Sequence, residues 1–168
     1  MTATERTLVM YGEGAREAAH RMLPKLPEER FVPAGAGAAG VRDAVATAVE
    51  EGVAQVVLVA GLGEQIAVLG GMAGLLESVT LDMDCGVALA GEVSRAASPR
   101  DVYALWEAAG KLGPCGRELC RRTAGELERV AAEAAGAPDA QDAPVAAQVV
   151  LVDAAGERMV GVYGRMAR

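Results

Sequence analysis

Aromatic residues and histidine are scarce in this chain, and their scarcity excludes several classes of protein. Of 168 residues, five are aromatic and one is a histidine, His20. Proteins that bind single-stranded nucleic acid need aromatic platforms on which bases stack, so this class is disfavoured. A single histidine excludes His-rich metal sites and leaves little room for a histidine-based catalytic triad, and we expect no metal centre. For His20 itself we expect a structural role at a surface or half-buried position.

Positive charge is also in short supply. The chain has 16 Lys and Arg against 23 Asp and Glu, which gives a net charge of −7. A chain with this charge lacks the excess of Lys and Arg that binds a phosphate backbone, so we expect no nucleic-acid partner. Three cysteines cannot all pair within one chain, and the first residues lack the basic-then-apolar profile of an export signal. These features predict a protein of the reducing cytoplasm.

One apolar stretch, Val53 to Leu76, is long enough to span a bilayer. Its centre carries Glu64 and Gln65 between glycines, and an acid in mid-membrane costs roughly 2.5–3.5 kcal/mol on insertion scales. A buried strand, a tight turn and a helix explain the same residues better. We therefore expect no membrane partner.

Small aliphatic residues are abundant instead. Alanine and glycine number 35 and 21, one third of the chain, and 52% of all residues are hydrophobic. This composition predicts a globular protein with an aliphatic core and closely packed backbones. The length fits a single α/β domain over residues 1–168. We expect a body of βαβ type over 1–135, a proline-bounded linker over 136–145, and a hairpin over 146–168 packed on the same sheet.

Strand, glycine turn and helix alternate along the chain, which is typical of a mostly parallel sheet flanked by helices. Short apolar runs predict strands at 7–11, 31–32 and 55–60, and strands at 147–152 and 158–163 form the closing hairpin around a turn at 153–156. Helices are predicted over 14–23, around Val41, Val45 and Val49, and across Ile66 to Met72. Two more are predicted over 82–95 and 100–112, and Ser98 and Pro99 provide the start of the second of these. Gly113 and Pro114 should then break the chain before a helix over 115–135.

Two glycine turns, Gly12-Glu13-Gly14 and Gly61-Leu62-Gly63, follow predicted strands and precede helices. In open α/β sheets ligands collect at this edge, because free amide groups and helix dipoles meet there. We therefore predict that Gly12, Glu13, Gly14, Gly61, Gly63 and Glu64 bind a cofactor, although either turn could be a tight turn and no more. The two glutamates disfavour a phosphate and suit a ribose hydroxyl or a neutral adenosine edge.

Two other groups of polar residues allow both a chemical and a structural interpretation. Asp82 and Asp84 could hold a divalent ion or act as an acid and base, but a solvated cap at a helix start is the commoner role. Cys115 and Cys120 stand five apart, outside the spacing of zinc or redox motifs. Neighbouring arginines could lower the pKa of a thiol; a pair of small, half-buried side chains is the commoner case.

The order of these segments resembles a known family. The chain begins with a strand and a GxG turn, followed by a Gly-rich helix start. Next come the run VVLV-A-GLG-x-x-I-x-V-x-G-G-M, a helix that begins with proline, and a closing hairpin with a D-x-x-G-E turn. This arrangement is similar to the C-terminal half of the cobalt-precorrin-5B C1-methyltransferase (CbiD) family of cobalamin biosynthesis. The resemblance implies a Rossmann-like domain that acts in corrin-ring methylation with S-adenosylmethionine as cofactor. It also implies a corrinoid substrate and either a partner chain that supplies an N-terminal domain or a homodimer.

The chain departs from the family at polar positions. Where the family has G-H-x-G-K, Gly61 stands in place of the histidine, Gly63 keeps the second glycine and Glu64 replaces the lysine. Where the family has T-H-S, this chain has Leu75, Leu76 and Glu77. The resemblance therefore leaves catalytic residues unassigned, and a non-catalytic ligand-binding or accessory module on the same scaffold is the alternative. An enzyme on another small substrate, with Glu13, Glu64 and Asp82 as acid and base, ranks last.

Overall fold

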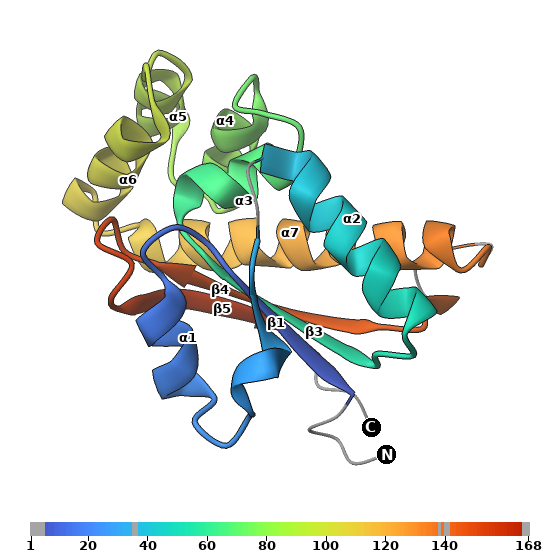
Figure 1. The fold of residues 1–168 in the computed structure, drawn as a ribbon. Coiled ribbons are helices and arrows are strands. Elements are labelled where there is room, and N and C mark those ends of the chain that lie inside the picture. Colours follow the sequence, from blue (N-terminus) through green and yellow to red (C-terminus); the bar gives the residue numbers. More distant parts are fainter. Residues whose placement is uncertain (1–5, 35–36, 138, 140–141, 166–168) are drawn as a thin grey trace.

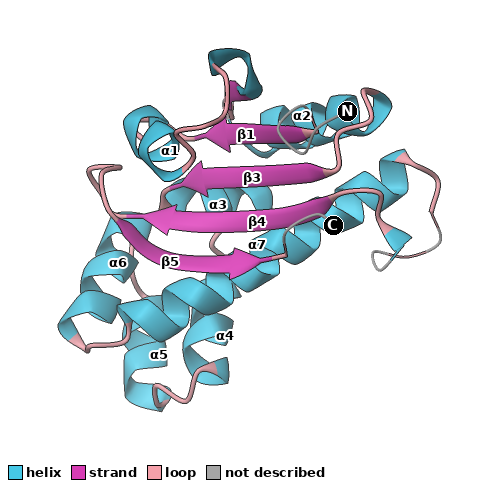
Figure 2. Cartoon of the chain, turned by 90° about the horizontal axis from the view of Figure 1, so that it is seen from below, coloured by secondary structure: helices cyan, strands magenta, loops and turns pink. Residues whose placement is uncertain are grey.

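Five strands form one sheet in the order β2-β1-β3-β4-β5, in a computed structural model that describes residues 6–34, 37–137, 139 and 142–165 (Figure 1). The strands are β1 (Thr7–Tyr11), β2 (Phe31–Pro33), β3 (Gln55–Ala60), β4 (Ala146–Val152) and β5 (Met159–Gly164). The first four are parallel, and β5 runs antiparallel to β4 (Figure 2). The expected mostly parallel sheet with a C-terminal hairpin is confirmed.

Helices cover both faces of this sheet. In Figure 1, α1 (Arg16–Met22) lies below the sheet, while α2 (Gly37–Glu50), α3 (Leu62–Val68) and α7 (Leu112–Ala134) lie above it. Three further helices, α4 (Leu75–Asp82), α5 (Val87–Ser94) and α6 (Pro99–Ala108), gather beyond α3, and a short 3-10 turn, η1 (Glu28–Arg30), precedes β2. Within the described part of the chain, no helix is both long and apolar enough to cross a membrane.

The central strand β3 is buried along its whole length, which explains the apolar run from Val56 to Ala60 after the buried Gln55. Val56, Leu58 and Ala60 face the larger core under α2, α3 and α7. Val57 and Val59 face a smaller core that includes the alanines of α1. Because successive side chains of a strand point to opposite faces, one apolar run supplies both cores.

Helix boundaries differ from the sequence prediction in several places, and α4 was not predicted. The helix expected through Met72 ends as α3 at Val68, because Gly70 and Gly71 adopt positive φ angles of 99° and 117°. The helix expected over 82–95 is α5 alone, and it begins at Val87.

The break expected at Gly113 and Pro114 is wrong. Both residues lie in the first turn of α7, where a backbone N–H has no partner within the helix, so proline removes nothing there. The opening of α6 is as predicted, since Ser98 Oγ accepts a hydrogen bond of 3.2 Å from the backbone N–H of Asp101.

Tight turns bring the backbone of distant segments together at the carboxyl ends of the parallel strands. Gly156, in the turn between β4 and β5, has a φ of 76° and lies against the turn after β1. A β-carbon at Gly156 would sit 2.5 Å from the carbonyl oxygen of Gly14. The hairpin therefore packs against the β1–α1 turn because no side chain stands between them.

We expect Gly156→Ala to destabilise the fold through two effects, the left-handed backbone and the overlap with Gly14. Gly52 is a matched control, because its φ is 77° but no atom lies within 4 Å of a β-carbon placed there. Gly52→Ala should lower the free energy of unfolding by roughly 1–2 kcal/mol, and Gly156→Ala by at least about 1 kcal/mol more. Urea unfolding of both variants measures the difference, and equal losses would show that the contact with Gly14 is unimportant.

Candidate functional site

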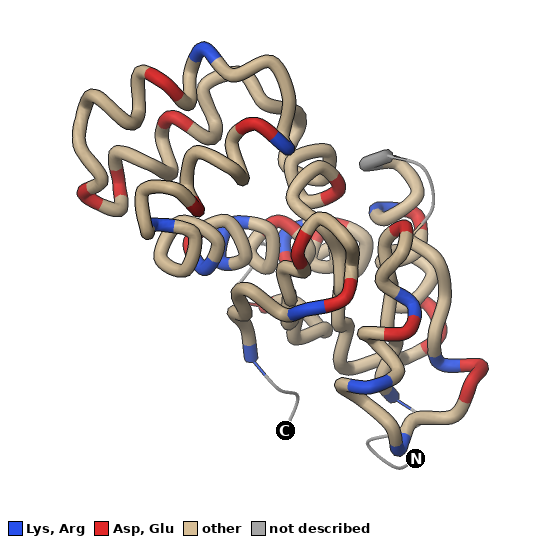
Figure 3. The backbone as a smooth tube through the Cα atoms, turned by 90° about the vertical axis from the view of Figure 1, so that its left-hand side faces the viewer, with Lys and Arg blue, Asp and Glu red and all other residues tan. Residues whose placement is uncertain are grey.

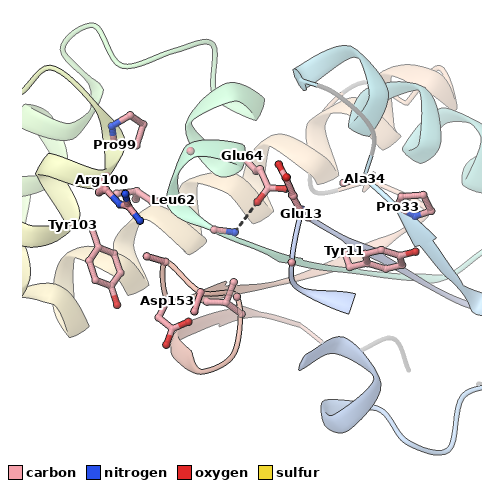
Figure 4. A pocket seen from close by; sticks show the side chains of 18 residues that line it. Tyr11, Glu13, Pro33, Ala34, Leu62, Glu64, Pro99, Arg100, Tyr103 and Asp153 are labelled. Carbon is pink, nitrogen blue, oxygen red and sulfur yellow. Dashed lines mark hydrogen bonds between the residues drawn. The ribbon is translucent and has the colours of Figure 1, made fainter. Parts of the chain in front are cut away.

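A pocket of about 830 Å³ lies at the carboxyl ends of β1, β3 and β4. The strand order reverses between β1 and β3, which is the place where open α/β sheets bind ligands. The turns after β1 and β3 and the β4–β5 turn line the pocket, and α6 contributes Pro99, Arg100 and Tyr103 from the side (Figure 4).

All six residues predicted to bind a cofactor line this pocket: Gly12, Glu13, Gly14, Gly61, Gly63 and Glu64. The structure thus brings the two glycine turns together, although what they bind stays a prediction. Sequence reasoning missed the contribution of α6 and of the β4–β5 turn. The D-x-x-G turn motif was visible in the sequence, but nothing in it indicated that this turn packs beside the first glycine turn.

The Glu64 carboxylate joins the two glycine turns. Its Oε2 accepts a hydrogen bond of 2.9 Å from the backbone N–H of Glu13, and its Oε1 accepts one of 3.1 Å from the backbone N–H of Gly61. A β-carbon at Gly12 would overlap this carboxylate. Glycine at position 12 therefore makes room for an acid from the neighbouring turn, and the N-terminus of α3 receives an internal negative charge that accepts a hydrogen bond from its cap residue Gly61.

A second acid of the pocket, Asp153, holds the β4–β5 turn in shape. Its carboxylate accepts hydrogen bonds from the backbone N–H groups of Glu157 at 2.9 Å and Arg158 at 3.4 Å, and from Arg158 Nε at 3.3 Å. The Glu157 amide in particular lowers the pKa of Asp153. Asp153 is therefore an ionised structural group whose acceptor positions are largely used by its own turn.

Tyr103 and Arg100 reach the pocket from the first turns of α6 (Figure 4). Burial, with the nearby carboxylates of Glu107 and Asp153, raises the pKa of Tyr103, so its hydroxyl stays neutral and can donate a hydrogen bond. Arg100 is exposed and is the one cationic side chain among the described lining residues. Of the pocket's three carboxylates, that of Asp153 is paired with Arg158 at 3.3 Å. Glu13 and Glu64 are therefore the lining acids for which the described structure shows no ion pair, against one guanidinium, which is a small excess of negative charge.

The wider chain shows the same mixture of charges. Figure 3 places the Lys and Arg positions of the described chain among Asp and Glu positions. Several arginines are engaged in ion pairs along α7, for example Arg129 with Glu126 at 2.7 Å. The charge of the pocket is therefore a local property, set by the few acids and the single arginine that line it.

Asp82 does not join the pocket, and the structure corrects its predicted role. It is the last residue of α4 and not a cap at a helix start, because the chain turns at Asp84, whose φ is 56°, before α5 begins. Asp82 Oδ2 pairs with Arg122 Nη2 at 2.5 Å, and Arg122 Nε also pairs with Glu118 at 2.8 Å. Asp82 is therefore not placed to act with Glu13 and Glu64.

Glu118 offers a test of this charge network. Hydrogen bonding from Arg121, and further from Arg122, lowers the pKa of Glu118 to about 2 from an ordinary value of 4.5. The native state therefore binds this proton more weakly than the unfolded state, so the stabilisation is complete above about pH 4.5 and is lost as pH falls toward 2.

Glu118→Gln should consequently flatten the fall in the free energy of unfolding between pH 4.5 and 3, measured by urea titration. Glu133→Gln removes a much more exposed acid of the same helix, paired with Arg129 at 3.0 Å, and is the control. An equal flattening in both variants would contradict a special role for the Glu118 network.

The cysteines lie in the core, away from the pocket. Cys115 and Cys120 are fully buried, and Cys115 Sγ is 3.6 Å from Sγ of the half-buried Cys85. Burial raises the pKa of Cys115 to about 12 and that of Cys120 to about 11. The suggestion that neighbouring arginines lower a thiol pKa is therefore wrong, because burial dominates, and Arg121 and Arg122 pair with Glu118 instead.

These thiols should be inert in the folded protein. At pH 8 we expect iodoacetamide to leave Cys115 and Cys120 unmodified over a time in which the half-buried Cys85 reacts slowly, because a buried thiol with a high pKa holds almost no thiolate. Peptide mass spectrometry measures the labelling, and the urea-unfolded chain, in which all three should react, is the control. Fast labelling of Cys120 in the native state would contradict the buried position.

His20 has the structural position expected for it. It is half-buried, and its ring stacks on Phe31 with centroids 3.9 Å apart and an interplanar angle of 20°. Among the described residues, no group of three or more His, Cys, Asp or Glu side chains is close enough to hold a metal ion.

Comparison with known proteins supports an assignment for this arrangement. The chain is 37% identical, over 96% of its length, to a cobalt-precorrin-5B C(1)-methyltransferase of Salinispora tropica, and 36% identical, over 98%, to one of Salinispora arenicola. The predicted resemblance to this family is confirmed. The chain spans about two fifths of the length of these relatives, 42% and 43%, which is consistent with one half of such a protein. No family model and no solved structure matches the chain.

Proposed function

We propose that this chain is the methyl-donor-binding part of a corrin-ring C-methyltransferase and that its pocket binds S-adenosylmethionine. The observation that carries the proposal is the match, over nearly all of the chain, to proteins named cobalt-precorrin-5B C(1)-methyltransferase. Bound S-adenosylmethionine supplies a methyl group attached to a sulfonium centre. The residues of the chain would hold and orient this donor at the carboxyl edge of the sheet.

The pocket fits the donor better than it fits the corrin. A corrin precursor carries many carboxylates, and the pocket has Glu13 and Glu64 against one arginine, with Asp153 paired to Arg158, so the pocket and the corrin carboxylates would repel. S-adenosylmethionine has a net positive charge, a ribose diol and a terminal carboxylate. Arg100 can pair with that carboxylate, and Glu64 can accept hydrogen bonds from hydroxyl groups. Leu62 and Pro99, on the α6 side of the pocket, can supply apolar surface for the adenine.

A non-catalytic ligand-binding module is the second candidate. The substitutions that favour it lie in the pocket itself, where Gly61 and Glu64 replace the histidine and lysine that the family resemblance implies. Neither Glu13 nor Asp153 replaces the missing histidine as a catalytic base, since Glu13 is exposed and the Asp153 carboxylate accepts hydrogen bonds from its own turn. Binding without methyl transfer is the outcome that this candidate predicts.

Calorimetric titration with S-adenosylhomocysteine tests donor binding. We expect a micromolar dissociation constant, about −8 kcal/mol. Gly63→Val should weaken binding about tenfold or more, because Gly63 lines the pocket and a β-carbon there lies 3.8 Å from Pro99, so the fold accepts the side chain while the pocket narrows. Gly125→Val, on the exposed face of α7 with nothing within 4 Å, is the control. A folded chain that gives no binding heat argues against the donor site.

Methyl transfer is assayed separately, because the chain spans only about two fifths of the relatives. The chain is mixed with a cobalt-precorrin and S-adenosylmethionine, with and without the unmatched region of the Salinispora tropica relative supplied as a separate protein. Product that forms in either mixture supports the methyltransferase. Donor binding with no product in both mixtures supports the ligand-binding module.

A further inference from the structure

We propose that Glu64 determines the charge preference of the pocket: it excludes ligands that carry a phosphate at the β1–β3 edge and favours nucleosides whose substituents are neutral or cationic. The inference deepens the proposed function, on which it rests for the identity of the pocket. It concerns specificity and does not assign a catalytic role to Glu64.

The position of the Glu64 carboxylate is the first part of the argument. The backbone N–H groups of Glu13 and Gly61 converge on one point between two parallel strands, and the carboxylate fills that point with contacts of 2.9 and 3.1 Å. Backbone amides at this edge of an α/β sheet commonly receive an anion from the ligand. Here they already have one from the protein, so a phosphate would meet occupied donors and a like charge.

The charge of Glu64 is not neutralised within the described structure. Ion pairs join other acids to arginines, but none of those found involves Glu64. A carboxylate has about four acceptor positions, and the two amides use two of them. The others remain for hydrogen-bond donors of a ligand, such as hydroxyl or ammonium groups.

The other acids of the pocket cannot have the same effect. Glu13 is exposed, so solvent screens its charge, while the carboxylate of Asp153 already accepts three hydrogen bonds from Glu157 and Arg158. Glu64 is half-buried and is held by two hydrogen bonds against the glycine at position 12. It is therefore the lining acid whose charge is fixed in place, between the two glycine turns at the edge of the pocket (Figure 4).

The test compares adenosine, S-adenosylmethionine and adenosine 5′-monophosphate by calorimetry at low salt. In the wild type, we expect adenosine monophosphate to bind about tenfold or more weakly than adenosine, because its phosphate meets the Glu64 carboxylate. Glu64→Gln keeps the shape of the side chain without the charge. It should reduce the ratio of the two dissociation constants about tenfold and weaken binding of the cationic S-adenosylmethionine.

Glu77→Gln is the matched control. Glu77 is the third residue of α4 after a glycine cap, as Glu64 is the third residue of α3 after Gly61, but it does not line the pocket. Its substitution should leave the ratio of dissociation constants unchanged. Glu64→Ala, which empties the position, provides a second variant in case Glu64→Gln does not fold, and its effect on the ratio should be at least as large.

The outcomes separate this inference from the proposed function. An unchanged ratio in the Glu64 variants, with S-adenosylmethionine still bound by the wild type, overturns the inference alone. Adenosine monophosphate that binds only when Glu64 is replaced, with no binding of S-adenosylmethionine to any form, supports the inference and overturns the donor site. If none of the three compounds binds any folded form, both proposals are wrong.

Discussion

The hydrogen bonds that join Glu64 to the turn after β1 are the constraint on which the pocket depends. They fix the first turn of α3 against the end of a strand that is 51 residues distant in sequence, and they require that position 12 has no side chain. The hairpin turn approaches the same edge through Gly156, again by direct backbone contact. Small residues thus bring three turns together, and the pocket is the space that they and α6 enclose.

Much of the fold follows from the sequence, because the signals involved are local. The apolar run of β3 and the Ser98-Pro99 start of α6 each depend on residues adjacent in the chain, and the structure has both as predicted. The convergence of the two glycine turns also follows from the sequence, since the ends of parallel strands share one edge. The predicted identity of the site residues depended on this topological rule, not on any motif of high specificity.

The features that sequence analysis missed depend on contacts between distant segments. Asp82 is drawn into an ion pair with Arg122, 40 residues later, so its local preference for a helix start does not decide its role. Cys115 faces Cys85 across the core, and its burial outweighs the arginines that follow it in sequence. Pro114 shows a different limit of sequence analysis. Proline is accepted in the first turn of a helix but breaks a helix in its interior, and the sequence did not show that α7 begins at Leu112.

The pairing of β3 with β4 has a consequence for how the protein is made. Gln55 of β3 lies opposite Ala146 of β4, so the centre of the sheet joins segments that are far apart in the chain. During synthesis, the edge of β3 that pairs with β4 has no partner there until residues 146–152 have been made. Such non-local pairing slows folding and leaves a hydrophobic strand edge open to other chains. We therefore expect chaperones to raise the yield of folded protein during synthesis.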